Sequence, residues 1–160
     1  MTSSVNIHAS CVVLARAGEA FGAPPDAGIL LLGESGSGKS DLALRLIARG
    51  AMLVADDRCD LFLQDGVLRA RAPAVLAGLI EIRAVGIIAL PFAADARVTL
   101  AVRLVAPQGP ARLPEPAVYE PPAALRVPRH RWPSLVELAP FEASAPAKIA
   151  AAARGKFINT

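Results

Sequence analysis

The sequence has few aromatic residues, few cysteines and no long hydrophobic run. Aromatic residues make up 4% of its 160 residues, although hydrophobic residues make up 54%. The core must therefore be built mainly from Leu, Ile and Val, which suits layers of helix and sheet. The two cysteines, Cys11 and Cys59, match no metal-ligand or CxxC spacing. We expect both to be buried or semi-buried thiols without a disulfide.

The hydrophobic runs are too short for a membrane span of roughly 18 residues. The longest candidate, residues 76–94, is interrupted by Glu81, Arg83 and Pro91. The first residues lack the basic start and apolar stretch of a signal peptide. The net charge is +3, but the arginines are scattered and do not form basic runs interleaved with aromatic residues. These absences predict a single cytoplasmic domain over residues 1–160 that binds neither membrane nor nucleic acid.

The clearest motif is a glycine-rich loop between a predicted strand and a predicted helix. The apolar run Gly28–Leu32 resembles a strand covered on both faces in a parallel sheet, and it leads directly into GESGSGKS at residues 33–40. These letters satisfy the pattern G-x-x-x-x-G-K-[ST], in which backbone N–H groups surround phosphate oxygens. Leucines and alanines over residues 42–48 then supply an apolar helical face, with Gly50 at the expected C-terminal cap. The alternative is a Gly/Ser turn without a ligand, but the order strand, loop, helix favours an α/β phosphate site.

Each part of this loop has a chemical role. Lys39 supplies positive charge to the β- and γ-phosphates, and the Ser40 hydroxyl is a ligand for Mg²⁺. The helix that follows directs its positive dipole end at the anion. The predicted nucleotide-binding residues are Gly33, Glu34, Ser35, Gly36, Ser37, Gly38, Lys39 and Ser40.

Two aspartates follow the next predicted strand. Residues 51–55 are apolar and end at Asp56 and Asp57, and ligands bind at the carboxyl ends of strands in open α/β sheets. Adjacent residues on an extended chain point to opposite sides, so one catalytic aspartate is expected rather than two. The alternative is a solvated turn, which is common for paired aspartates.

Three further candidates remain open from the residues alone. Glu81 interrupts an apolar segment, so it either meets a metal or cation, pairs with Arg83, or faces solvent on a half-exposed strand. His8, on a Val-rich predicted strand, is by default a hydrogen-bonded core or surface histidine. Arg112 lies in a Pro-rich segment, where an exposed charge is the ordinary interpretation.

The remaining sequence predicts short elements around these motifs. Residues 15–27 and 107–133 are expected to be turn or loop because glycines and prolines recur there. Residues 59–70 resemble a hairpin that turns at residues 64–66. Further strands are expected at residues 6–14, 97–105 and 135–138, and an Ala-rich helix at residues 145–154.

The order and spacing of several blocks resemble the HPr kinase/phosphorylase family. These blocks are the glycine-rich loop at residues 33–40, LVADDR at 53–58, LIEIR at 79–83 and GII at 86–88. The chain is similar to a short form that has the C-terminal catalytic domain without an N-terminal regulatory domain. The resemblance implies a P-loop (Walker A) kinase domain with a mixed central sheet flanked by helices.

The resemblance also implies an activity and the residues that carry it. It implies an ATP- and Mg²⁺-dependent protein serine kinase that phosphorylates the phosphocarrier HPr, removes that phosphate by phosphorolysis, and assembles as a homo-hexamer. Asp57 would take the proton of the attacking serine and return it in the reverse reaction. The resemblance assigns catalytic roles to Asp57, His8, Lys39 and Arg112, and Mg²⁺ ligation to Ser40 and Glu81.

Two other functions are compatible with the same motifs. One is a regulatory module that senses ATP without transferring phosphate, and the other is a kinase of a small metabolite, because a fold does not fix its function. The segment at residues 125–131 has only partial likeness to the family's dephosphorylation loop. Kinase activity is therefore expected more strongly than phosphorylase activity.

Overall fold

A mixed sheet with helices around it forms the body of the protein in a computed structural model that describes residues 3–155. The ends of the predicted 1–160 domain lie outside these residues. The strands are β1 (Ser4–Val13), β2 (Ala27–Leu32), β3 (Met52–Ala55), β4 (Arg58–Gln64), β5 (Val67–Arg71), β6 (Leu79–Ile82), β7 (Gly86–Ala89), β8 (Ala96–Leu104), β9 (Ala117–Val118) and β10 (Ser134–Leu138). The α-helices are α1 (Lys39–Ala48) and α2 (Ala145–Ala152), and the 3-10 helices are η1 (Ala15–Phe21), η2 (Ala74–Leu76), η3 (Ala123–Leu125) and η4 (Arg129–Arg131).

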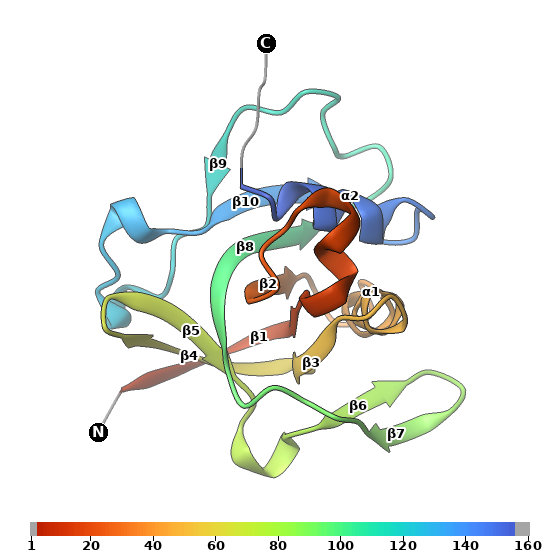
Figure 1. The fold of residues 1–160 in the computed structure, drawn as a ribbon, viewed down its shortest axis with the longest axis horizontal. Coiled ribbons are helices and arrows are strands. Elements are labelled where there is room, and N and C mark those ends of the chain that lie inside the picture. The colour runs from red at the N-terminus through yellow and green to blue at the C-terminus, as the bar shows by residue number, and fades with distance from the viewer. Residues whose placement is uncertain (1–2, 156–160) are drawn as a thin grey trace.

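The main sheet is mixed and strongly curved (Figure 1). Its strand order is β2-β1-β4-β5-β8-β10-β9, with β3 paired to β1. The long strand β8 pairs antiparallel with β5 and parallel with both β2 and β10, so the pairing closes back on β2. This arrangement confirms the expected mixed central sheet flanked by helices. The parallel environment expected for β2 is right for β8 but wrong for β1, which runs antiparallel to it.

The alternating side chains of the strands divide the core into two clusters. On β2, Ile29 and Leu31 pack with Leu42 and Leu46 of α1 on one face of the sheet. Leu30 points to the other face and belongs to the second cluster. Because α1 covers the first face directly after β2, the glycine-rich loop between them is held at the edge of the sheet.

Both cysteines lie in the second core cluster as free, buried thiols, which confirms the expectation from their spacing. Burial raises the pKa of the Cys59 thiol to about 12. Burial also raises the pKa of the Cys11 thiol. Desolvation penalises the thiolate, so both side chains act as apolar packing groups.

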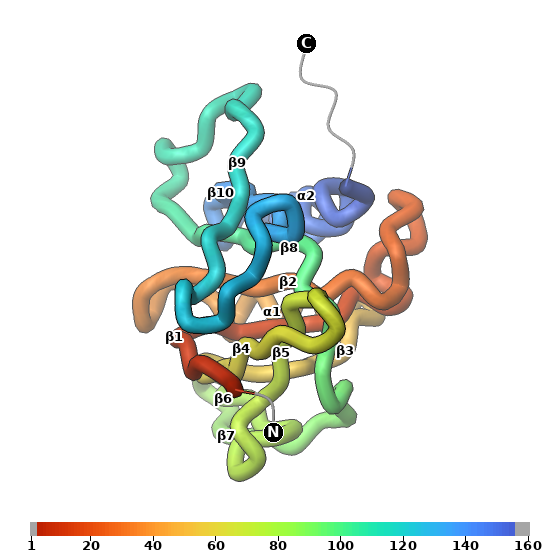
Figure 2. The backbone as a smooth tube through the Cα atoms, turned by 90° about the vertical axis from the view of Figure 1, so that its left-hand side faces the viewer, coloured from red at the N-terminus to blue at the C-terminus, as the bar shows by residue number. Residues whose placement is uncertain are grey.

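Two segments extend from this body. β6 and β7 form a separate two-stranded sheet, which projects at the bottom of Figure 1. The proline-rich connection after β8 passes β9 at the top of Figure 2 and returns toward β1, which η3 contacts. That connection holds only short elements, as expected for residues 107–133.

The other predicted elements are confirmed, with one correction. The hairpin at residues 59–70 is formed by β4 and β5, and the final helix begins at Ala145 with a proline in its first turn. The loop expected at residues 15–27 is wrong in part, because η1 occupies Ala15–Phe21 before Gly22 ends it with φ +71°. In the described part of the chain, no helix is long and apolar enough to cross a bilayer.

Candidate active site

The glycine-rich loop is shaped by close contacts that only glycine permits. A Cβ atom at Gly33 would lie 2.4 Å from the Ser37 hydroxyl oxygen, far inside normal contact. Gly36 and Gly38 adopt φ values of +82° and +102°, which are strained for other residues. The buried Ser37 hydroxyl has no hydrogen-bond partner within the described residues. An unpartnered hydroxyl in a curled loop fits a site completed by a polar ligand.

Lys39 is folded back onto the same loop. Its ammonium group donates hydrogen bonds to the backbone oxygens of Gly33 (2.7 Å) and Glu34 (2.9 Å). The residue is only 4% exposed. Burial lowers the pKa of Lys39, and the nearby carboxylates of Asp57 and Asp56 act in the opposite direction. The positive charge is thus already positioned at the loop before any anion arrives.

The two aspartates occupy a break between strands β3 and β4. β1 pairs with β3 at Cys11↔Ala55 and with β4 at His8↔Arg58, so Asp56 and Asp57 interrupt the ladder between these pairs. His8 and Ser10, two positions apart on β1, share one face of the strand. The break lets both aspartates meet side chains of that face.

Asp56 is the centre of a hydrogen-bond network. Its Oδ1 accepts hydrogen bonds from the Ser40 hydroxyl (2.6 Å) and the Ser10 hydroxyl (3.1 Å). Its Oδ2 accepts one from the backbone N–H of Glu81 (3.1 Å). This one carboxylate therefore joins the glycine-rich loop, β1 and the β6–β7 hairpin.

Asp57 is held in an uncommon backbone conformation. Its φ is +64°, a left-handed value that aspartate tolerates better than most residues. The backbone N–H of Asp57 donates to the Ser10 hydroxyl (3.0 Å), and His8 Nε2 lies 2.5 Å from Asp57 Oδ1. Asp57 is exposed, whereas Asp56 is half-buried. Strained residues of this kind cluster at functional sites.

These groups line one cavity of about 730 Å³. The glycine-rich loop and α1 form one wall, Asp56 and Asp57 lie between the walls, and residues 81–87 of the β6–β7 hairpin form the other wall. Phe141, which follows β10, completes the rim. The cavity thus joins the glycine-rich loop, two carboxylates and an exposed apolar hairpin.

The structure brings most of the predicted site residues together. Lys39, Ser40, Asp57 and Glu81 all line the cavity, and His8 reaches it through its contact with Asp57. Glu81 is exposed and alternates with buried Ile80 on β6, as on the half-exposed strand considered from the sequence.

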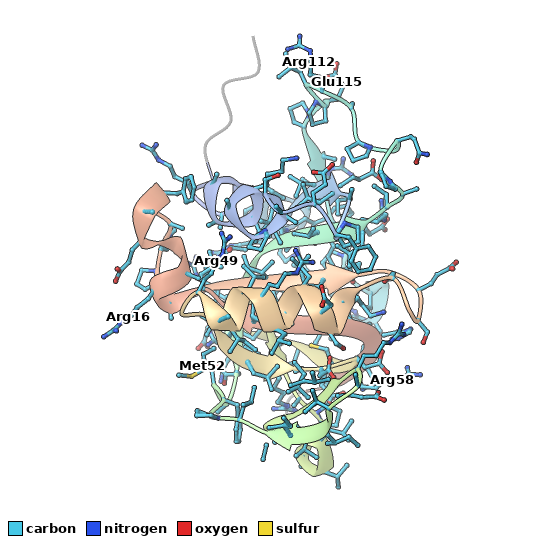
Figure 3. The ribbon with its side chains drawn as sticks, turned by 90° about the vertical axis from the view of Figure 1, so that its right-hand side faces the viewer. Arg16, Arg49, Met52, Arg58, Arg112 and Glu115 are labelled. Carbon is cyan, nitrogen blue, oxygen red and sulfur yellow. The ribbon has the colours of Figure 1, made fainter. Side chains whose placement is uncertain are left out.

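Arg112 is not among them. It is exposed in the segment before β9 and lies at the top of Figure 3, far from Arg58, which directly follows Asp57. Within one chain, the geometry gives a catalytic role of Arg112 no support, and that role stays a prediction. Arg83 lines the cavity instead.

Neither Ser10 nor Phe141 was predicted as a site residue from the sequence. Ser10 is a fully buried serine on a Val-rich strand. It donates to the carboxylate of one aspartate and accepts from the backbone of the other. Phe141 is a single aromatic residue in a loop. Their positions depend on pairings between distant strands, which no local pattern reveals.

The oxygen-rich side chains fit a magnesium ion. Mg²⁺ is commonly bound by one or two protein oxygens together with waters and substrate phosphates. The hydroxyl of Ser40 and the carboxylates of Asp56 and Glu81 offer such oxygens in the cavity. Over residues 3–155, no group of three or more His, Cys, Asp or Glu side chains could hold a metal by itself. The donor set therefore suits an ion that arrives with a phosphate ligand.

Known proteins share this combination of fold and motif. The family model of the HPr serine kinase C-terminal domain matches residues 23–101. Over this region the chain is similar to the HPr kinase/phosphorylase family. The matched region holds the glycine-rich loop, both aspartates and the hairpin, and it ends within β8.

Curated relatives match a shorter stretch at high identity. The HPr kinase/phosphorylase of Clostridium novyi is 53% identical over 64 residues, which are 40% of this chain and 21% of that protein. The protein of the same name from Lactiplantibacillus plantarum is 53% identical over 62 residues, which are 38% of this chain and 20% of that protein. The chain is matched over only about a fifth of the length of these relatives.

A solved structure matches almost the whole fold. The Hpr(Ser) kinase/phosphatase of Coxiella burnetii superposes with a TM-score of 0.69 at 26% sequence identity. The match covers 91% of this chain and 91% of that one. The strong local identity and the broad structural likeness agree in placing the P-loop kinase fold of the family here.

Proposed function

We propose that this chain is an ATP- and Mg²⁺-dependent protein serine kinase whose acceptor is a serine of HPr. The observation that carries the proposal is the placement of the Asp57 carboxylate in the same cavity as Lys39 and Ser40 of the glycine-rich loop. A phosphate loop alone binds nucleotides in many proteins. An exposed carboxylate across the cavity adds the group that a hydroxyl acceptor needs.

The transfer step follows from these positions. The acceptor serine oxygen forms a bond to the γ-phosphorus of ATP, the bond to the bridging oxygen breaks, and ADP leaves. The serine proton passes to the Asp57 carboxylate. Since one carboxyl can serve both directions, Asp57 would return the proton when inorganic phosphate attacks phosphoserine and forms pyrophosphate.

His8 and Ser10 act as positioning residues for this step. His8 Nε2 contacts Asp57 Oδ1, and the Ser10 hydroxyl accepts from the Asp57 backbone. Together they fix both the carboxylate and the left-handed turn that presents it. A carboxylate held in one orientation loses less freedom when the acceptor arrives.

The loop side binds and orients the nucleotide. Lys39 exchanges its backbone contacts in the loop for the β- and γ-phosphates, and the N-terminus of α1 adds its dipole. Ser40, Asp56 and Glu81 would hold Mg²⁺, which supplies charge neutralisation at the phosphoryl oxygens when bound. Asp56 orients the Ser40 hydroxyl through a 2.6 Å hydrogen bond.

The direct test is to incubate the purified chain with Mg·ATP and HPr and to follow the mass of HPr. A gain of one phosphate that disappears when the acceptor serine is replaced would support the proposal. Excess inorganic phosphate is then added, and removal of the phosphate with release of pyrophosphate would add the phosphorylase reaction.

Other results would select other functions. ATP binding without transfer to HPr would favour a sensor module. Transfer to a small hydroxyl compound, but not to HPr, would favour a metabolite kinase. Absence of nucleotide binding would overturn all three.

A further inference from the structure

A second cavity adjoins the cavity of the glycine-rich loop along α1. It measures about 490 Å³, within the range of small-molecule pockets. Its lining comes from α1 and the residue after it, from the loop that joins β10 to α2, and from the first turn of α2. Asp41 and Phe141 line both this cavity and the phosphate cavity. A molecule bound by the glycine-rich loop can therefore extend directly into the second cavity.

Phe141 lies at the boundary between the two cavities. A Cβ atom at Gly38 would lie only 2.9 Å from the ring carbon Cζ of Phe141, so the ring sits directly beside the loop backbone. The residue is nevertheless 70% exposed. A large aromatic ring that contacts a phosphate loop but leaves most of its surface in water is available to a planar ligand.

The position of Phe141 is fixed by its neighbours. Arg45 of α1 donates hydrogen bonds to the backbone oxygen of Pro140 and to that of Glu142 (3.3 Å), the residues on either side. Arg45 also pairs with Asp41 at 2.9 Å. The loop is thus fastened to the helix that begins at the phosphate site. Because Arg45 holds the backbone on both sides of Phe141, the loop does not have to become ordered when a ligand binds to the ring.

We propose that Phe141 is the stacking surface for the nucleobase of the bound nucleoside triphosphate, with the base in the second cavity. The proposal rests on the proposed function, because it requires the triphosphate to occupy the glycine-rich loop. Stacking on an aromatic ring tolerates any base, since every base has a π-face. Arg49, also in the cavity lining, offers a planar cation beside the base.

The test separates the base from the phosphates. Isothermal titration calorimetry with Mg·ATP, Mg·GTP and Mg·tripolyphosphate compares the wild type with Phe141→Ala, Phe141→Trp and Phe21→Ala. Phe21 is an exposed phenylalanine of η1 that lines neither cavity. We expect Phe141→Ala to weaken ATP and GTP about 10-fold or more and to leave tripolyphosphate unchanged. Phe141→Trp should restore nucleotide affinity, and Phe21→Ala should match the wild type.

Three results would overturn the proposal. Unchanged ATP affinity in Phe141→Ala would show that the base lies elsewhere. Equal weakening of ATP and tripolyphosphate would show that Phe141 only supports the phosphate loop. Wild-type affinity for ATP no greater than for tripolyphosphate would show that no base site exists.

The kinase proposal and the stacking proposal can be refuted independently of each other. Base-dependent binding without transfer to HPr would refute the kinase and leave the stacking site intact. If the wild type bound neither ATP nor tripolyphosphate, the phosphate site would be refuted, and both proposals with it.

Discussion

The two walls of the candidate active-site cavity are built differently. On the loop wall, Lys39 is buried and fastened to backbone oxygens, and Ser40 is tied to Asp56. On the hairpin wall, Val85 and Ile87 are 67% and 72% exposed, although they belong to the matched family region. The side chains of the glycine-rich loop are thus already held by hydrogen bonds. The hairpin, in contrast, exposes apolar side chains that a binding partner could contact.

The hairpin is still anchored at two points. Ile80 is buried in the same core cluster as Leu42 of α1, and the Glu81 backbone donates to Asp56. Its tip, by contrast, carries exposed apolar residues that no described strand covers. We expect this tip to meet the acceptor protein, since exposed apolar patches commonly mark contact surfaces.

The largest expected effect comes from Asp57, between the two walls. Asp57→Asn should reduce phosphoryl transfer by roughly 10²- to 10⁴-fold, because the amide cannot accept the serine proton. Nucleotide affinity should stay near the wild-type value, and both quantities can be measured by intact-mass kinetics and calorimetry. Asp65→Asn is the matched control, since Asp65 also has a positive φ (+52°) but lies in the exposed β4–β5 turn. Equal transfer by the two variants would remove Asp57 from this role.

The buried residue Ile80, which packs the hairpin onto the core, should contribute more to the free energy of unfolding than the exposed residue Ile87. Ile80→Ala removes a side chain that is 1% exposed and leaves a cavity beside α1. We expect the free energy of unfolding to fall by about 2–5 kcal/mol, measured by chemical denaturation. A change below about 1 kcal/mol would mean that the hairpin does not pack on the core as described.

A substitution of Asp56 tests how much its hydrogen bonds contribute to stability and to magnesium binding. Asp56→Asn can keep an acceptor for Ser40 and Ser10, but it then places an amide donor against the Glu81 backbone N–H. The unmatched donors should lower the free energy of unfolding by about 1–3 kcal/mol. The Mg²⁺ concentration for half-maximal activity should rise, as a magnesium titration would show. An unchanged magnesium requirement would separate Asp56 from the metal site.

The smallest stability effect is expected at the hairpin tip. Ile87→Ser should change the free energy of unfolding by less than about 0.5 kcal/mol, because the side chain is already exposed. The rate of transfer to HPr at low HPr concentration should nevertheless fall, because the KM for HPr rises while the affinity for ATP stays unchanged. A wild-type KM would place the acceptor contact elsewhere.

Local patterns predicted the elements that carry the phosphate site. The apolar run of β2, the glycines and the leucines of α1 are neighbours in sequence, so their order alone defined strand, loop and helix. The hairpin of β4 and β5 was likewise readable from its turn residues. The antiparallel partner of β2 was not, because β1 is separated from it by η1, where only a loop was expected.

The roles of the two aspartates could not be separated from the sequence. Adjacent acidic residues look equivalent until the ladder beside β1 breaks between Ala55 and Arg58. That break directs Asp56 to Ser40 and Asp57 to His8. The resemblance singled out Asp57, but it gave no place to Ser10, which contacts both aspartates.

The sequence by itself therefore determined the glycine-rich loop between β2 and α1, because a strand, a glycine turn and a helix fold from adjacent residues. Only the tertiary structure decided that both aspartates line the cavity, with Asp57 exposed beside His8 and Asp56 hydrogen-bonded to Ser40, Ser10 and the Glu81 backbone. It also placed Phe141 beside the glycine-rich loop and Arg112 far from it. The physical reason is that these positions follow from the register of β1 and from the attachment of the β10–α2 loop to α1, contacts between residues far apart in the chain.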